Sequence, residues 1–396
     1  MNPFEASSKI VVTCNKRLAP FLEEEVTELG FKPQRTFSTG LELNGTMLDC
    51  IRLNLNLRCA SQVLYSVKAF PADRPDAVYQ QLVALPWETL IASDGYLSVT
   101  STVDHFTVNN NLFVNVKVKD AIADRIRRHA GERPDSGPEL DGTVIHLFWR
   151  EEMAEVFIDT SGHTLAKHGY RKIPGKAPML EALATATVMA TKWDRKSPFI
   201  NPMCGSGTIA IEALMIATNR RPGLYRSNYG FMHVTGFDPT MYEVERKRLE
   251  EQVVEIPGLM IVATDNRQDA IDISRINAGA ADVDHLIQLS VCDFTETPVP
   301  ETPGVVYLNP EYGERMGELE ELQVTYANIG DFLKKKCQGY LGYIFTGNLD
   351  LAKKIGLRAS RRIEFFNAKL DCRLLEYELY AGSRRQPKPD KVSSAE

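Results

Sequence analysis

The residues with the clearest chemical potential form the string NPMCGSGT at positions 201–208. An apolar stretch typical of a buried strand precedes it, and an Ala/Ile/Leu-rich stretch typical of a helix follows. Gly205 and Gly207 permit a tight turn and a close backbone approach, so a ligand can lie against the sheet edge and the helix N-terminus. Many turns use a Gly-x-Gly pair only for geometry, but the complete string is far more specific. The predicted ligand-binding residues are Asn201, Pro202, Met203, Cys204, Gly205, Ser206, Gly207 and Thr208.

Acids at two further strand ends suit a nucleoside. Asp265, followed by Asn266, ends the apolar stretch LMIVATD, and an acid at this position accepts hydrogen bonds from ribose hydroxyls. Asp238 is closer to the usual spacing of about 20 residues, but the charged helix after it resembles part of an insertion, so we favour Asp265. The alternative for Asp265 is a cap on the next helix. Asp293 and Phe294 end the following strand and suit an adenine amino group and ring stacking.

A fourth strand end carries the string NPEY at 309–312, which we call the elbow. A base amino nitrogen is a poor nucleophile while its lone pair is delocalised into the ring. The Asn309 side-chain carbonyl and the Pro310 backbone carbonyl can accept its hydrogens, which favours attack of that lone pair on a methyl group. Tyr312 can stack on a base taken out of its helix. Asn-Pro in isolation indicates a simple turn, but beside the glycine string it indicates a catalytic element.

Strands and helices alternate around these motifs. The predicted helices are 178–193, 209–217 and 267–281, and the predicted strands lie within 197–208, 259–265, 285–294 and 304–313. This alternation predicts an α/β fold with a doubly wound, mostly parallel sheet whose ligands bind at the carboxyl ends of the strands.

The first part of the chain follows a different pattern, typical of small α+β units. A strand (9–15), a helix (18–30), and short strands with another helix near 47–67 form the first unit. A helix (78–91), a strand (96–103), a helix (118–131) and a hairpin (143–150 and 154–160) form the second. A connector rich in Gly, Lys, Arg and His covers 161–178, and a polar tail ends the chain.

Composition limits the classes of function. A length of 396 residues predicts two or three domains, and a net charge of -6 excludes a surface coated in basic charge. The seven cysteines are scattered and never spaced as CxxC, so neither a disulfide framework nor a zinc site is expected. Neither a signal peptide nor a membrane span is evident, and we expect a soluble cytoplasmic protein.

Taken together, the motifs resemble the bacterial guanine-N2 methyltransferases of large-subunit (23S) ribosomal RNA. The resemblance is carried by NPMCGSGT, RPGLYRSNYGFM and NPEYGERMG, with FVNVKVKDAIADRIRR and DTSGHTLAKHGYR upstream, and it covers nearly the whole chain. It implies a ferredoxin-like unit (1–56), a THUMP RNA-binding domain (57–162), a Rossmann-like class I methyltransferase domain (163–383) and a polar tail (384–396). It also implies S-adenosylmethionine as donor, S-adenosylhomocysteine as product, and a guanine exocyclic amine as acceptor.

The resemblance assigns roles to individual positions. Residues 201–208 match the donor-binding loop, Asp265 the ribose acid and Asp293 the adenine-side acid. The helix start that lines the donor pocket matches Pro178, Leu180 and Glu181, and the catalytic Asn-Pro-Pro-Tyr pattern matches Asn309, Pro310 and Tyr312.

The chain departs from this family in two places. Glu311 stands where the family usually has a second proline, and its carboxylate can alter base choice by accepting from guanine N1–H and N2–H. Some relatives also carry another methyltransferase domain after this one. Structured RNA is the expected partner, with ribosomal RNA favoured over tRNA. No metal is required, because the sulfonium donor is already activated.

Local basic runs supply the candidates for RNA contact. These are Lys117, Lys119, Arg125, Arg127, Arg128, His168, Arg171, Lys172 and Lys176. Such contacts position a substrate without specifying its sequence, and a charge run is usually a solvated face. A third run, Arg384 and Arg385, lies in the tail that we expect to be disordered.

Three other functions stay open. A guanine-N2 methyltransferase of tRNA would share the same motifs, since THUMP domains commonly serve tRNA enzymes. An adenine-N6 DNA methylase shares the Asn-Pro chemistry but would not need an RNA-binding half. A catalytically inactive RNA-binding or assembly factor would keep the fold, with Glu311 as the sign of lost activity.

Overall fold

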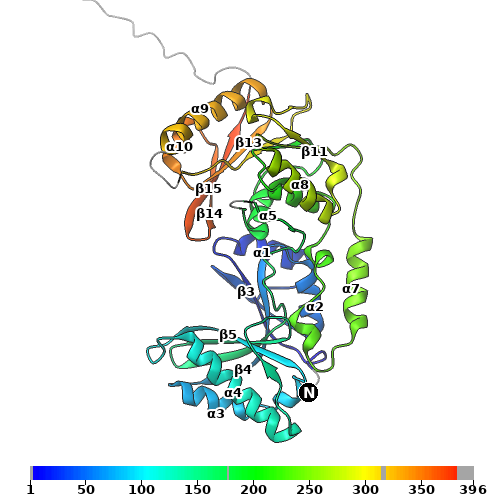
Figure 1. Ribbon diagram of the computed structural model, residues 1–396, viewed down its shortest axis with the longest axis vertical. Coiled ribbons are helices and arrows are strands. Elements are labelled where there is room, and N and C mark those ends of the chain that lie inside the picture. Colours follow the sequence, from blue (N-terminus) through cyan, green and yellow to red (C-terminus); the bar gives the residue numbers. More distant parts are fainter. Residues whose placement is uncertain (1–2, 176–177, 314–317, 381–396) are drawn as a thin grey trace, which may run out of the picture.

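The computed structural model describes residues 3–175, 178–313 and 318–380. Within these residues the strands form two sheets, one from strands up to Asp159 and one from strands that begin at Phe199. Figure 1 shows the two sheets separated along the long axis of the molecule, with the N-terminal sheet at the bottom.

The N-terminal sheet has the strand order β2-β3-β1-β4-β8-β7-β5-β6. Its strands are β1 (Ser8–Cys14), β2 (Arg35–Phe37), β3 (Gly40–Gly45), β4 (Ala60–Pro71), β5 (Tyr96–Asp104), β6 (Asp135–Ser136), β7 (Thr143–Arg150) and β8 (Met153–Asp159). The predicted hairpin is the antiparallel pair β7–β8. Strand β4 pairs with β1 on one side and with β8 on the other. The two units predicted from the sequence therefore share one continuous sheet.

The helices of this half are α1 (Ala19–Glu28), α2 (Met47–Asn56), α3 (Pro75–Val83) and α4 (Asn111–Ala130). Helix α3 is shorter than predicted, because Pro86 cannot donate a backbone hydrogen bond, and a 3-10 turn at Trp87–Thr89 follows. Helix α4 begins before the predicted start, because the Asn110 side chain caps it by accepting from the Leu112 amide at 2.9 Å. It ends at Gly131 in the left-handed conformation, as predicted.

The C-terminal sheet has the order β11-β10-β9-β12-β13-β15-β14. Its strands are β9 (Phe199–Pro202), β10 (Ile261–Asp265), β11 (Ile287–Val291), β12 (Val305–Leu308), β13 (Leu341–Thr346), β14 (Arg361–Asn367) and β15 (Leu370–Glu378). The first five in spatial order are parallel, and β15 runs antiparallel to both of its neighbours. The predicted doubly wound, mostly parallel sheet is confirmed.

Helices cover this sheet on both faces. They are α5 (Glu181–Met189), α6 (Thr208–Ala217), α8 (Gln268–Ala280), α9 (Glu318–Lys336) and α10 (Leu349–Lys354), whereas α7 (Pro239–Glu251) lies in the segment between α6 and β10. Every residue of β9, β12 and α6 is buried, as expected for central strands of a sheet with both faces covered. Helix α5 and strand β11 form at the predicted positions but are shorter than the predicted stretches.

The segment between α6 and β10 joins the two halves. Helix α7 within it packs against α2 of the N-terminal half (Figure 1). The Asn56 side chain donates to the Glu245 carboxylate at 2.6 Å, and Gly223 lies so close to Leu55 that an added Cβ would be 2.6 Å from its Cα. The segment that looked like an insertion in the sequence therefore forms part of the contact between the halves.

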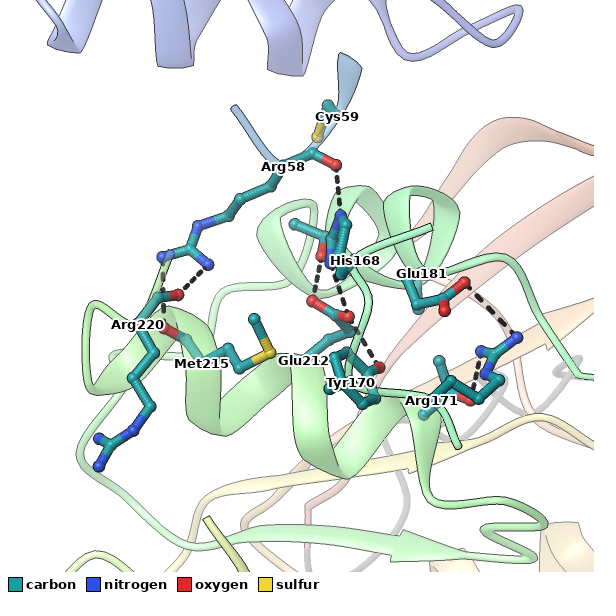
Figure 2. A network of polar contacts seen from close by, with 12 residues as sticks. Arg58, Cys59, His168, Tyr170, Arg171, Glu181, Glu212, Met215 and Arg220 are labelled. Carbon is teal, nitrogen blue, oxygen red and sulfur yellow. Dashed lines mark hydrogen bonds and ion pairs between the residues drawn. The ribbon is translucent and has the colours of Figure 1, made fainter. Parts of the chain in front are cut away.

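A buried network completes this contact (Figure 2). The Arg58 guanidinium donates to the backbone carbonyls of Arg220 at 2.6 Å and Met215 at 3.3 Å, near the end of α6. His168, in the connector, lies between the Arg58 carbonyl at 2.8 Å and the Glu212 carboxylate at 2.9 Å. The connector is therefore packed into the junction.

His168 is a buried cation in this network. Both of its ring nitrogens face acceptors, so each must carry a hydrogen. Burial opposes the charged imidazole, but the Glu212 charge and the hydrogen bonds that His168 donates to Glu212 and to the Arg58 carbonyl outweigh burial and raise the pKa of His168. Because His168 is fully buried, it cannot contact RNA, and that prediction is corrected.

Replacement of His168 by alanine should lower the free energy of unfolding by about 3–5 kcal/mol, the cost of leaving one member of a buried ion pair alone. The raised pKa means that the charge stabilises the fold fully below the unfolded-state pKa of about 6.5 and loses this effect as pH rises through the folded-state pKa. Urea unfolding across this range should give a difference between wild type and His168→Ala that shrinks toward alkaline pH. A difference that stays constant or grows would contradict a charged His168.

Candidate active site

The site is built at the point where the strand order of the C-terminal sheet reverses. Strand β9 lies between β10 and β12 and is parallel to both, so the carboxyl ends of all three strands meet at one edge. The Asn201 side chain donates to the Tyr307 carbonyl at 2.9 Å and ties the end of β9 to β12. The loop after β9 and the elbow after β12 therefore leave the sheet side by side.

The loop after β9, residues 203–207, is the glycine loop. Met203, Gly205 and Gly207 all have positive φ, at +57°, +56° and +79°. An added Cβ on Gly207 would lie 3.0 Å from the Ser274 Oγ of α8, whereas nothing lies within 4 Å of one added to Gly205. Ser274 also donates to the Gly205 carbonyl at 2.8 Å. One side of the loop is thus packed against α8 and the Gly205 side is open.

Asp265 lies directly beside the glycine loop. Its Oδ2 accepts from the Gly205 amide at 3.0 Å and its Oδ1 from the Arg267 amide at 3.2 Å. Asn266, the next residue, is exposed. Asp238, the alternative considered from the sequence, instead caps α7 by accepting from the Thr240 amide at 2.9 Å. Of the two acids, Asp265 is the one at the sheet edge.

The end of β11 carries the second pair of candidates. Asp293 accepts from the amide and hydroxyl of Thr295, at 2.9 and 2.6 Å, and so caps a 3-10 turn (Phe294–Glu296). The ring of Phe294 is 9% exposed and lies edge-on against Phe332 of α9, with ring centroids 6.1 Å apart. The Phe294 ring therefore faces the core, and stacking on an adenine is not a role it can take in this arrangement.

The connector supports the glycine loop through Asn277 of α8. The Asn277 Oδ1 accepts from the amides of Lys172 at 2.9 Å and Ile173 at 3.1 Å. Its amide group donates to the carbonyls of Ile173 at 3.0 Å and Ser206 at 3.2 Å. One side chain thus fixes the connector against the loop. Ser274 and Asn277 were not predicted as site residues, although two polar residues three apart on one predicted helix were the available signal.

Arg171 supports the starts of two helices. It donates to the Met179 carbonyl at 2.6 Å and the Thr208 hydroxyl at 2.9 Å, and lies 3.5 Å from the Glu181 carboxylate (Figure 2). The prediction that Arg171 contacts RNA is corrected, because its guanidinium is almost buried and engaged in these contacts.

Three buried polar atoms near this point have no hydrogen-bond partner within the described part of the chain. They are Glu181 Oε2, Asn201 Oδ1 and Arg171 Nε. Burial raises the pKa of Glu181, and the Arg171 charge partly offsets this. Unpartnered buried polar atoms are rare in native proteins. Glu181 begins α5, next to Pro178 and Leu180, and Asn201 lies in β9, so a polar ligand at these two predicted donor-binding positions would give these atoms partners.

At the elbow, the two predicted catalytic side chains contact each other. The Tyr312 hydroxyl donates to the Asn309 Oδ1 at 2.8 Å. Burial raises the pKa of Tyr312, so its hydroxyl stays protonated and can donate. Pro310 is buried and Glu311 is exposed. The Glu311 carbonyl accepts from the Tyr326 hydroxyl at 3.1 Å, which fixes the elbow to α9.

A row of aromatic rings links the elbow to the N-terminal half. Tyr312 lies 6.3 Å from Phe345, Phe345 lies 6.2 Å from Phe365, and Phe365 stacks on Phe21 of α1 at 5.7 Å. Phe345 and Phe365 are fully buried. This row could not be predicted from the sequence, because four rings so far apart in the chain leave no local pattern.

Four of the five predicted RNA-contacting cations of α4 form ion pairs with carboxylates. The ion pairs are Lys117–Asp76 at 2.9 Å, Lys119–Asp120 at 3.3 Å, Arg125–Glu88 at 2.7 Å and Arg127–Asp124 at 3.1 Å. Arg128 and Lys172 are exposed. Lys176, Arg384 and Arg385 lie outside the described residues.

Among the residues that the structure describes, no group of three or more His, Cys, Asp or Glu side chains is placed to hold a metal ion. In the same residues, no helix has the length and apolarity needed to cross a membrane.

Comparison with known proteins identifies the family. A family model described as the RMKL-like methyltransferase domain matches residues 168–376, which is more than half of the chain. The chain belongs to this family. Upstream of the RMKL-like domain, the RlmL ferredoxin-like domain matches residues 9–64 and the THUMP domain matches residues 72–159. The predicted fold class is therefore confirmed.

Individual relatives agree with the RMKL-like assignment. Ribosomal RNA large subunit methyltransferase K/L of Syntrophotalea carbinolica is 33% identical over 387 residues, which cover 95% of this chain and 54% of that protein. The chain thus spans about half the length of the curated relatives it matches. The structure of SMU.472, solved with SAH, has a TM-score of 0.85 at 25% identity and covers 96% of this chain and 100% of its own. A predicted N6-adenine-specific DNA methylase from Listeria monocytogenes has a TM-score of 0.84 at 28% identity and covers 94% of this chain and 97% of its own.

Replacement of Asn277 by alanine removes four hydrogen bonds and should lower the free energy of unfolding by about 2–4 kcal/mol, at about 1 kcal/mol each. Arg275→Ala, at an exposed position on the same helix, is the matched control and should change it by less than about 0.5 kcal/mol. Equal unfolding midpoints for the two variants would show that the connector is not held by Asn277.

Proposed function

We propose that this chain is an S-adenosylmethionine-dependent RNA methyltransferase acting on the exocyclic N2 amine of a guanine in large-subunit (23S) ribosomal RNA. The observation that carries the proposal is the side-by-side departure of the glycine loop and the elbow from one edge of the sheet. The named ribosomal RNA methyltransferases among its relatives support the reaction and the class of RNA. We propose the cytoplasm as its place of action.

The donor would be held by the glycine loop and its neighbours. Asp265 is the acid proposed for the ribose hydroxyls, and Asp293 for the adenine side. The Glu181 carboxylate and the Asn201 Oδ1, which has no hydrogen-bond partner among the described residues, suit the ammonium group of the donor, since each can accept a hydrogen bond. When bound, S-adenosylmethionine supplies a methyl group already activated by its sulfonium. The SMU.472 structure with SAH supports this choice of cofactor.

The elbow would orient the acceptor. The Asn309 side-chain carbonyl and the Pro310 carbonyl accept the hydrogens of the guanine amine, which directs its lone pair toward the donor methyl group. No strong base is needed during the attack, because the proton leaves afterwards. In this structure the Asn309 Oδ1 already accepts a hydrogen bond from the Tyr312 hydroxyl. We propose that Tyr312 exchanges this bond for stacking on the flipped base.

The N-terminal half would bind the folded RNA that contains the target. For the whole chain, we propose a ferredoxin-like unit at 1–56, a THUMP domain at 57–162 and a methyltransferase domain at 163–383. The first boundary follows the last residue of α2, and the second falls in the packed connector. The contact through Arg58 and His168 would keep the RNA-binding half in a fixed position relative to the elbow.

The direct test gives the purified protein labelled donor with three substrates: 23S ribosomal RNA from cells lacking this gene, tRNA, and DNA. Transfer to guanine N2 of the ribosomal RNA is expected. Transfer to tRNA would favour the tRNA enzyme, and transfer to DNA adenine would favour the activity named for the Listeria relative. No transfer from a folded protein that binds SAH by calorimetry would contradict the proposal. A protein that binds RNA but not SAH would be an inactive assembly factor.

Variants of the elbow separate its roles. Asn309→Ala should lower kcat by about 100-fold, as expected for loss of one preorganised polar contact at a reacting group. Tyr312→Ala should lower kcat/KM by about 10- to 100-fold through lost stacking. Tyr312→Phe keeps the ring and frees Asn309, so its kcat should equal or exceed that of wild type. A Tyr312→Phe enzyme as slow as Tyr312→Ala would contradict the proposed exchange.

Glu311 is proposed to contribute to base choice through its exposed carboxylate. Glu311→Gln keeps the size of the side chain but can accept through one oxygen only, so kcat/KM for guanine methylation should fall by about tenfold, the value of one charge-assisted hydrogen bond. Nucleoside mass spectrometry of the product identifies the methylated base. Unchanged rate and base in Glu311→Gln would exclude this role.

A further inference from the structure

A cluster of cations lies where the N-terminal half contacts the β14–β15 hairpin. Lys16 and Arg17 follow β1. Lys369 lies in the turn between β14 and β15, and Arg373 lies on β15. We call these four residues the junction cluster. The Lys16 Nζ lies 4.4 Å from the centre of the Phe366 ring, and Arg17 forms an ion pair with Glu364. Figure 1 shows the hairpin, in red, extending from the C-terminal sheet toward the blue N-terminal elements.

The junction cluster keeps an excess of positive charge. Its four cations are accompanied by two carboxylates, Asp371 and Glu364. Arg373 pairs with both of them, and Arg17 pairs with Glu364. The pKa of Asp371 is lowered, first by its hydrogen bond with Arg373 and further by the charges of Arg17 and Lys16. Lys16 and Lys369 are exposed. The predicted cations of α4, by contrast, mostly have a carboxylate partner each.

The same hairpin lies against the elbow. The Asn367 side chain, at the end of β14, opposes through a hydrogen bond the rise that burial causes in the pKa of Tyr312. Leu370, at the start of β15, and the Tyr312 ring both border Gly347, since a Cβ added there would lie 2.4 Å from Leu370 and 3.2 Å from Tyr312. Lys369 of the junction cluster is therefore next in the chain to Leu370, which borders the same glycine as Tyr312, the residue proposed to stack on the base.

We propose that the junction cluster, with the ring of Phe366, binds the single-stranded RNA that flanks the target nucleotide. Cations beside an aromatic ring are the combination that binds single strands without reading their sequence. A strand held there would contact both halves of the protein and lie next to Tyr312. The inference rests on the proposed RNA substrate, but it concerns binding of the strand and not the transfer reaction.

The test uses the full-length protein and a single-stranded oligouridylate of about ten nucleotides, within the range that such surfaces bind. The variant Lys16→Gln/Lys369→Gln removes two exposed charges. The matched control, Lys247→Gln/Lys335→Gln, removes two from α7 and α9, where the side chains are 76% and 72% exposed. Fluorescence anisotropy over a series of salt concentrations gives the affinity and its salt dependence, and calorimetry gives the SAH affinity of each protein.

The junction variant should bind the oligouridylate on the order of tenfold more weakly than the control, and its plot of log affinity against log salt should be shallower by about 1.4, or about 0.7 for each lost phosphate contact. Both variants should bind SAH as wild type does. Equal affinity and equal salt dependence in the two variants would overturn the inference. Failure of wild-type protein to methylate ribosomal RNA, with this difference intact, would overturn the proposed function and leave the RNA surface standing.

Discussion

The structure depends on the parallel pairing of β9 with β10 on one side and β12 on the other. This pairing brings three carboxyl strand ends to one edge, although the residues that follow them are far apart in the chain. The bond from Asn201 to the Tyr307 carbonyl fixes the two central ends against each other. Asp265, the glycine loop and the elbow all take their positions from this arrangement. The proposed donor site and the proposed acceptor site are therefore next to each other at one edge of the sheet.

The N-terminal half is connected to that edge by rigid contacts. The charged pair of His168 and Glu212 joins the connector to α6 beneath the glycine loop. On the opposite side, Phe21 of α1 reaches the elbow through Phe365 and Phe345. His168, Glu212, Phe345 and Phe365 are fully buried, where geometry is difficult to change without loss of packing. RNA bound to the first half would thus be presented to the elbow in a defined orientation.

Local patterns predict most of the C-terminal domain. Alternating apolar stretches, the glycines of the loop and the strand-ending acids are properties of short segments, so the sheet and the place of Asp265 follow from them. Local patterns do not predict whether a cationic side chain contacts RNA or is buried. His168 lies opposite Glu212, 44 positions along the chain, and Phe294 turns toward Phe332, so their burial depends on tertiary packing. The same limit hid Asn277, whose partners lie in the connector and the loop.

The most direct measurement is the crystal structure of this protein with SAH and a guanine-containing RNA bound. The account predicts the ribose of SAH at Asp265 and its sulfur facing a guanine amine held by Asn309, with the Tyr312 hydroxyl released from Asn309. SAH bound elsewhere, or a base that enters from an edge of the sheet remote from the elbow, would contradict it.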